Sequence, residues 1–203
     1  MQIIFVLLVE PEFCNAPYRT IADASGVSLG TVASVFRALD RDGYVARTAH
    51  GRELRRTSRL LNTWTDGYRV RLFDKLRLGG FGANQPDWWQ VSRDVVRQAG
   101  GQWGGETAVW AAGGNLRPAQ GIVYVDDVAP SLVGALRLRR DPRNPAPAEL
   151  RRRFWRVPSW SERDTVPSPL VYADLLADGD PRLIEAAASL RNNDPELRRL
   201  DES

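Results

Sequence analysis

Four polar side chains recur near the start of the chain at intervals of three residues, away from the apolar row of an expected helix. They are Ser28, Thr31, Ser34 and Arg37. Short hydroxyl side chains allow the backbone of a helix to approach DNA closely, and they can bond phosphate oxygens. The guanidinium of Arg37 matches the edge of a guanine base. The pattern predicts a recognition helix that binds double-stranded DNA.

A basic segment follows these residues along the chain. Between Arg41 and Arg59 there are six arginines and only two acidic residues, Asp42 and Glu53. Such an excess of positive charge attracts the phosphate backbone. We therefore expect further DNA contacts from Arg47, His50, Arg52 and Arg55. Winged helices, the DNA-binding modules in which such residues occur, also bind other proteins, and exposed serine and threonine are common on any helix. Binding to a protein instead of DNA therefore remains an alternative.

A few acidic residues could instead carry metal chemistry. The motif "YVDD" places Asp126 and Asp127 after a strand, and Glu106 lies upstream. Paired carboxylates hold catalytic metal ions in nucleases and polymerases. However, no lysine follows at the acid-x-lysine spacing of nucleases, and an Asp-Asp pair after a strand more often caps the next turn. We expect no catalytic residue, metal or cofactor, and a metal-dependent nuclease or nucleotidyl enzyme remains the alternative.

Aromatic residues interleave with arginines in "RRRFWRV", at 151–157. This pattern could form a second nucleic-acid surface, because bases stack on aromatic rings. The chain has seven tryptophans in all, and scattered tryptophans are more typical of cores and interfaces. His50 and Cys14 lack the partners that a catalytic base or nucleophile needs.

The first part of the chain predicts the helices and strands that would position the recognition residues. Residues 1–9 predict an apolar core helix, and "YRTIADAS" predicts a second helix that ends at Gly26. Ser28 is the expected N-cap of a third helix, whose apolar face recurs at helical spacing. Two strands around the turn "TAHG" follow it. This order predicts a winged helix-turn-helix domain over residues 1–57.

The remaining chain predicts a mixed α/β domain. A connecting helix is expected over 58–71, and "GGFGA" is expected to be a flexible break. Helices are expected in "PDWWQVSRDVVRQAG", "GGETAVWAAGG" and "APSLVGALRLRR", and strands in "GIVYVDD" and "RRRFWRV", with "DPRNPAPAE" as a surface loop. Two helices broken at "DGDP" complete the domain, which we place at 72–195, and 196–203 is expected to be a polar tail. The fold class is therefore α+β.

The composition indicates the class of the protein and the compartment in which we expect it. The chain has 203 residues, 43% of them hydrophobic, and a formal net charge of +3, with Lys75 as the only lysine. This length and composition suit a folded protein with a substantial core. A single cysteine cannot form an internal disulfide, so we expect a reducing, cytoplasmic setting. The apolar run "IIFVLLV" is too short to span a membrane, and no membrane partner is expected.

The assembled pattern resembles the abortive-infection type IV antitoxin family, the AbiEi-like winged-helix transcriptional regulators. One matching block is "YRTIADASGVSLGTVASVFRALDRDGYV", and a second is "LLNTWTDGYRVRL". The C-terminal part contributes "GGETAVWAAGGNLRPAQGIVYV" and "PLVYADLLADGDPRLIEAA". The positions that match the family pattern there are Gly104, Gly105, Glu106, Tyr172, Asp174, Asp180 and Arg182.

The resemblance implies a regulator that represses its own operon by binding operator DNA, for which we expect an inverted repeat. It also implies a C-terminal antitoxin domain that neutralises a nucleotidyltransferase-like toxin. For the family-pattern residues, structural roles are also adequate: the glycines allow close packing, Asp180 can cap a helix and Arg182 can pair with a carboxylate. A plasmid replication initiator is a further alternative, because winged helices also bind repeated origin sequences.

Overall fold

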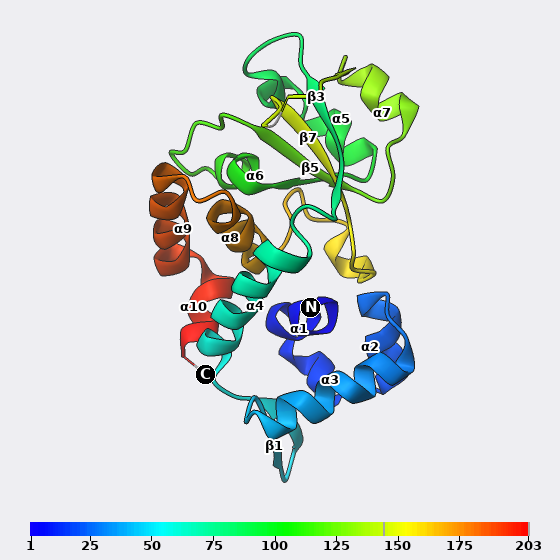
Figure 1. Ribbon diagram of the computed structural model, residues 1–203, viewed down its shortest axis with the longest axis vertical. Helices are drawn as coiled ribbons and strands as arrows, with labels where there is room; N and C mark the ends of the chain where they lie inside the picture. The colour runs from blue at the N-terminus through cyan, green and yellow to red at the C-terminus, as the bar shows by residue number, and fades with distance from the viewer. Residues whose placement is uncertain (144, 203) are drawn as a thin grey trace.

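The computed structural model describes residues 1–143 and 145–202. Its fold is of the α+β class, as expected, with a five-stranded sheet and helices at one end and a group of helices with a small hairpin at the other (Figure 1). No helix in the described ranges is both long and apolar enough to cross a membrane.

The N-terminal helices follow the predicted order. They are α1 (Gln2–Val9), the 3-10 turn η1 (Pro11–Asn15), α2 (Tyr18–Ser25) and α3 (Leu29–Arg41). Gly26 ends α2 with φ +64°, a left-handed conformation that glycine adopts at little cost. The hydroxyl oxygen of Ser28 then accepts a hydrogen bond from the Thr31 backbone N–H at 3.3 Å and caps α3. The arrangement fits a helix-turn-helix.

A hairpin and a long helix come next. The antiparallel strands β1 (Val45–Thr48) and β2 (Gly51–Leu54) pair from Val45 with Leu54 to Thr48 with Gly51. Helix α4 (Thr57–Arg71) begins just after β2. Its buried face includes the predicted residues Leu60, Leu61, Trp64 and Tyr68.

The five-stranded sheet has the order β4-β5-β7-β3-β6. Its strands are β3 (Arg77–Gly82), β4 (Gln102–Gly104), β5 (Gly121–Val125), β6 (Arg139–Arg140) and β7 (Ala148–Arg152). Only the central pair β5 and β7 is parallel among the pairings of the described strands. All five residues of β5 are buried, which matches the predicted buried strand.

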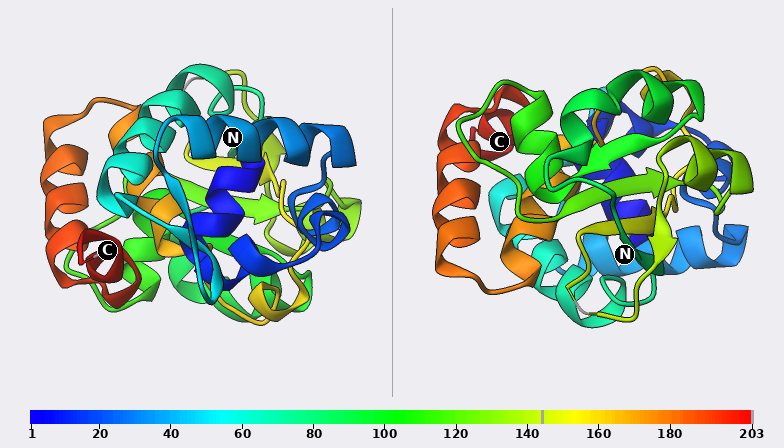
Figure 2. Two further views of the ribbon diagram at one scale, coloured as in Figure 1. Left: turned by 90° about the horizontal axis from the view of Figure 1, so that it is seen from below. Right: turned by 90° about the horizontal axis from the view of Figure 1, so that it is seen from above.

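Short helices cover the sheet, and three helices complete the chain. The covering elements are η2 (Trp88–Val91), α5 (Arg93–Gln98), α6 (Gly105–Ala111), α7 (Pro130–Ala135) and η3 (Pro158–Trp160). The final helices are α8 (Ser168–Ala177), α9 (Pro181–Asn193) and α10 (Pro195–Asp201). In both views of Figure 2 the blue first helix lies near the middle of the molecule, among elements from later in the chain.

Three local expectations are corrected by the structure. The glycines of "GGFGA" lie largely within β3, because that strand pairs with both β7 and β6 and buries Phe81 between them. The strand expected at "RRRFWRV" lies earlier, at Ala148–Arg152, so part of the expected loop "DPRNPAPAE" is strand; residue 144 of that loop lies outside the described residues. The expected polar tail forms α10, which buries Leu197 and Leu200.

One hydrophobic core joins the two ends of the molecule. Phe5 of α1 stacks on Trp64 of α4 with ring centres 5.3 Å apart. The same ring contacts Trp160, with centres 5.7 Å apart. The backbone N–H of Arg156 donates to the carbonyl oxygen of Ala24 at the end of α2, at 2.7 Å. The segment after β7 is therefore attached directly to the helix-turn-helix.

Candidate functional site

The outer face of α3 carries the polar residues that the sequence singled out. Ser28, Thr31, Ser34 and Arg37 are all exposed. The opposite face buries Val32, Phe36 and Leu39. An Nη atom of Arg37 donates to the Ser34 hydroxyl at 3.2 Å, so these two side chains lie together at the surface. Because the apolar face of α3 packs against the core, its polar face presents hydroxyl and guanidinium groups to solvent.

The basic residues of the hairpin fall into different environments. Arg47 and His50 are exposed on and beside the strands. Arg55 is also exposed and forms an ion pair with Glu53 at 2.7 Å. Arg52 is half-buried, and its guanidinium lies over the rings of Tyr18 and Phe36.

The aromatic residues of "RRRFWRV" belong to the core. Phe154 and Trp155 contact Phe5 with ring centres 5.0 Å and 5.5 Å away. Trp155 is buried, so its ring is not available for base stacking. Two of the arginines in this segment, Arg152 and Arg156, are exposed.

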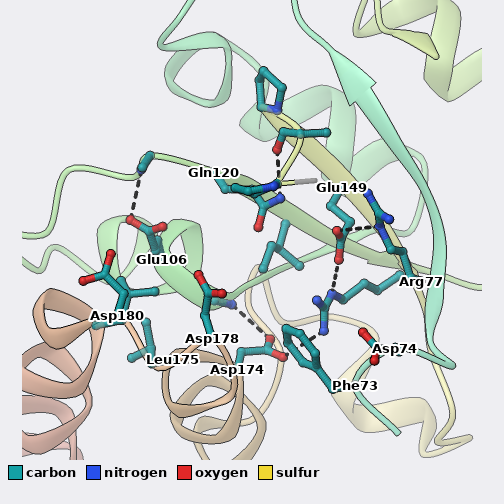
Figure 3. Close-up of a pocket in the computed structure, with 18 of the residues that line it drawn as sticks. Phe73, Asp74, Arg77, Glu106, Gln120, Glu149, Asp174, Leu175, Asp178 and Asp180 are labelled. Atoms are coloured by element: carbon teal, nitrogen blue, oxygen red, sulfur yellow. Dashed lines mark hydrogen bonds and ion pairs between the residues drawn. The ribbon is translucent and has the colours of Figure 1, made fainter. Parts of the chain in front are cut away.

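A cavity of about 430 Å³ in the C-terminal part gathers most of the residues of the family pattern. Gly105, Glu106, Asp174, Asp180 and Arg182 all line it, although they come from α6, α8 and the start of α9. Figure 3 shows Glu106 and Asp180 on one side of this cavity, and Glu149, Arg77 and Phe73 on the other.

The Glu106 side of the cavity is held by charge-assisted hydrogen bonds. One Glu106 carboxylate oxygen accepts from an Nη atom of Arg182 at 2.7 Å and from the Ala119 backbone N–H at 3.0 Å. Asp180 caps α9 by accepting from the Arg182 backbone N–H at 2.8 Å. Asp180 therefore caps a helix and Arg182 pairs with a carboxylate, which are the structural roles considered from the sequence, and the Arg182–Glu106 contact joins α6 to α9.

Asp174 is the centre of a buried polar network on the other side. Its carboxylate accepts from the hydroxyls of Tyr68 at 2.6 Å and Tyr124 at 2.9 Å. The Gly105 backbone N–H also donates to it, at 3.2 Å. A Cβ atom on Gly104 would lie 2.5 Å from the Tyr124 ring, so this close approach requires glycine there.

The network continues through a buried arginine on β7. Arg151 lies 3.5 Å from an oxygen of Asp174 and donates to Glu149 at 2.6 Å, while its guanidinium carbon is 3.9 Å from the centre of the Phe73 ring. Glu149 also pairs with Arg77 on β3, at 2.9 Å. Six elements, α4, α6, α8, β3, β5 and β7, therefore meet in one set of hydrogen bonds and ion pairs.

Burial controls protonation in this network. Desolvation raises the pKa of Asp174 above its usual value, and Arg151 and the two tyrosine hydroxyls oppose this rise. Burial, followed by the neighbouring Asp174 carboxylate, raises the pKa of Tyr68 and Tyr124 well above the usual range. Burial acts to lower the pKa of Arg151, but the neighbouring side chains of Tyr124, Tyr68, Asp174 and Glu149 outweigh this effect and raise the pKa. The tyrosines and Arg151 therefore stay protonated.

Sequence reasoning missed most of this network. Glu149 and Arg151 alternate with the apolar, buried residues Ala148 and Leu150 along β7. A pair of opposite charges at i and i+2 on one face of such a strand was the available signal. Tyr172 of the family pattern faces elsewhere, with its ring centre 5.4 Å from the Arg191 guanidinium carbon.

The structure does not bring the acidic residues of the nuclease alternative together. Glu106 lines the cavity of about 430 Å³, whereas Asp126 lines a separate hollow near Gly26 and lies 3.2 Å from Arg153. Asp127 is exposed and accepts from the Val128 backbone N–H. Within 1–143 and 145–202, no group of three or more His, Cys, Asp or Glu side chains could hold a metal ion.

The family model that matches this chain describes transcriptional regulators, AbiEi antitoxins of type IV toxin–antitoxin systems, and the match covers residues 53–195. The chain belongs to the AbiEi antitoxin family. The match includes the cavity that Glu106 lines and the polar network around Asp174. It begins at Glu53, so α3 lies outside it. No curated protein and no solved structure gives a significant match.

Proposed function

We propose that this AbiEi family member is a DNA-binding repressor of its own operon, with a winged helix-turn-helix formed by α2, α3 and the β1–β2 hairpin. The observation that carries the proposal is the outer face of α3, where Ser28, Thr31, Ser34 and Arg37 are exposed after a capped helix-turn-helix. A helix with short polar side chains on its free face suits the major groove of DNA.

The exposed residues of the hairpin support a second set of contacts. Arg47 and His50 lie on the strand and turn that follow α3, and neither side chain is covered. Side chains of this kind bind phosphates and contribute affinity without reading the sequence. Base contacts by α3 and phosphate contacts by the hairpin together make a repressor that recognises one operator.

The antitoxin activity is assigned to the region that the family model covers. We expect the C-terminal region to neutralise a nucleotidyltransferase-like toxin encoded beside this chain. Co-expression of the neighbouring toxin gene with residues 1–203 should restore growth, and this rescue should persist in a DNA-binding variant such as Arg37→Ala. Loss of rescue in that variant would mean that neutralisation depends on operator binding.

The DNA-binding proposal is tested with a fragment from upstream of the gene, in gel-shift titrations. Arg37→Ala should weaken binding by about 1–3 kcal/mol if Arg37 contacts a guanine, because a bidentate contact is lost. The matched control is Arg97→Ala, which removes the same charge from α5, where Arg97 is exposed and pairs with Asp94. It should bind as the wild type does.

Two results would contradict the proposal. One is equal affinity of the wild type, Arg37→Ala and Thr31→Ala for the upstream fragment. The other is protection of several direct repeats instead of one inverted repeat in a footprint, which would favour a replication initiator. Binding by the wild type should also weaken steeply with salt, since phosphate contacts release counterions.

A further inference from the structure

Arg52 stands apart from the other basic residues of the hairpin because its contacts lie inside the protein. Its guanidinium carbon is 5.0 Å from the centre of the Tyr18 ring and 4.7 Å from that of the Phe36 ring. One Nη atom also donates to the carbonyl oxygen of Ala16 at 3.1 Å. Tyr18 belongs to α2 and Phe36 to α3, so one guanidinium attaches the hairpin to both helices of the helix-turn-helix.

The backbone of Arg52 is held as well. Its N–H donates to the Asn15 side-chain oxygen at 2.6 Å, and the Asn15 side-chain nitrogen donates to its carbonyl oxygen at 2.9 Å. The Asn15 amide therefore pairs with β2 as a neighbouring strand would. The adjacent Gly51 has φ +118°, and a Cβ atom there would lie 2.3 Å from the Asn15 oxygen, so this approach requires glycine.

The exposed residues Arg47 and His50 are held in place relative to β2 by the pairing of the hairpin. Arg47 lies directly opposite Arg52 in the register of the hairpin, and His50 is in the turn next to Gly51. A two-stranded hairpin has little stability of its own. Its direction relative to α3 therefore depends on side chains that attach it to the helices, and the contacts of Asn15 and Arg52 do this.

We propose that Asn15 and Arg52 are positioning residues, which set the orientation of the hairpin so that Arg47 and His50 reach the DNA flanking α3. This inference rests on the proposed function, because the hairpin is a DNA-contacting element only there. Arg52 then supports binding without touching DNA itself, although its residue type and place on the hairpin suggest a direct phosphate contact.

The test uses operator-binding titrations of the full chain with Arg52→Lys, Arg52→Gln and Asn15→Ala. Lysine keeps the charge but lacks the planar group that stacks on two rings. Asn15→Ala breaks two hydrogen bonds and changes no charge. We expect each of the three variants to weaken binding by about fivefold to tenfold. If Arg52→Lys binds like the wild type and only Arg52→Gln is weak, Arg52 contacts phosphate directly and the proposal is overturned.

A second measurement asks whether the effect passes through the hairpin. In an Arg47→Ala background part of the hairpin contact is already lost, so Asn15→Ala should weaken binding less there than in the wild type. In an Arg37→Ala background its effect should be undiminished, because Arg37 binds from α3. Equal losses in both backgrounds, or a smaller loss in the Arg37→Ala background, would overturn the proposal, since Asn15 would then act on something other than the hairpin.

Failure of this inference is distinguishable from failure of the proposed function. If the wild type binds no upstream DNA, the repressor proposal itself is wrong. If the wild type binds and Arg37→Ala weakens binding, while Arg52→Lys and Asn15→Ala bind normally, only the positioning role is wrong.

Discussion

Cys14 illustrates how the chemistry of one residue depends on its surroundings. The residue lies in η1 beside the anchored hairpin and is 1% exposed. Burial raises the pKa of its thiol, and the positive charge of Arg52 partly opposes this effect. Because the thiolate is the reactive form, a raised pKa and a covered sulfur both suppress reaction.

We therefore expect Cys14 to react slowly with a thiol reagent in the native protein and rapidly in denaturant. The absorbance change with a disulfide reagent at neutral pH measures both rates. Rapid modification of the native wild type, at a rate close to that of a free thiol, would contradict this account.

At the scale of elements, α10 shows why a polar segment is not always a tail. Its sequence, PELRRLD, is mostly charged, yet Leu197 and Leu200 are buried. Asp194 caps it by accepting from the Leu197 backbone N–H at 3.1 Å. Arg191 of α9 forms an ion pair with Asp201 at its end. Two buried apolar residues, a cap and an ion pair therefore help to hold this short helix, which contacts α4 and α9.

The Arg191–Asp201 pair makes this attachment dependent on pH. Hydrogen bonding by Arg191 holds the pKa of Asp201 below its usual value. A lowered pKa in the folded state stabilises the protein above the unfolded value of about 3.9, and this contribution is lost as the pH falls through the folded value. Asp201→Asn should therefore be less stable than the wild type at neutral pH, and the difference should shrink below about pH 4.

Urea unfolding of both proteins across this pH range measures the difference. The control is Glu202→Gln, which removes a charge from the next residue, an exposed one. Its stability should follow that of the wild type within about 0.5 kcal/mol. A difference between Asp201→Asn and the wild type that is constant down to acid pH would show that the pair does not act through its charge.

At the scale of the whole molecule, the Asp174 network links the connecting helix to the sheet and to α8. Among the described residues, Arg151 is the cationic partner of the Asp174 carboxylate, and it also pairs with Glu149. Removing one partner from a buried ion pair leaves the other charge without compensation. The elements that meet at Asp174 should therefore lose stability together when Arg151 is replaced.

Arg151→Met is expected to lower the free energy of unfolding by about 3–5 kcal/mol, because it leaves the buried Asp174 carboxylate without its guanidinium partner. The neighbouring Arg152→Met changes the same charge at an exposed position and should lie within about 0.5 kcal/mol of the wild type. Urea denaturation followed by tryptophan fluorescence compares the two. Equal stability of both variants would mean that the network contributes little to folding.

Local signals in the sequence were sufficient for the helix-turn-helix region and the surface of α3. Gly26, the cap at Ser28 and the apolar face of α3 act over a few residues, so their outcome follows from the local chain. The same is true of the buried strand β5 and of the break between α8 and α9.

Contacts between segments that are distant in the sequence decided the extent of β3, the presence of α10 and the orientation of Arg52. The extent of β3 depends on pairing with β6 and β7, and the helix at the C-terminus depends on a surface made by α4 and α9. Arg52 and Arg47 have the same charge and lie opposite each other, but Arg52 turns inward onto the rings of Tyr18 and Phe36 and the Ala16 carbonyl oxygen. Arg47 stays exposed. Residue type set what each side chain could do, and packing between distant segments decided which of those contacts it makes.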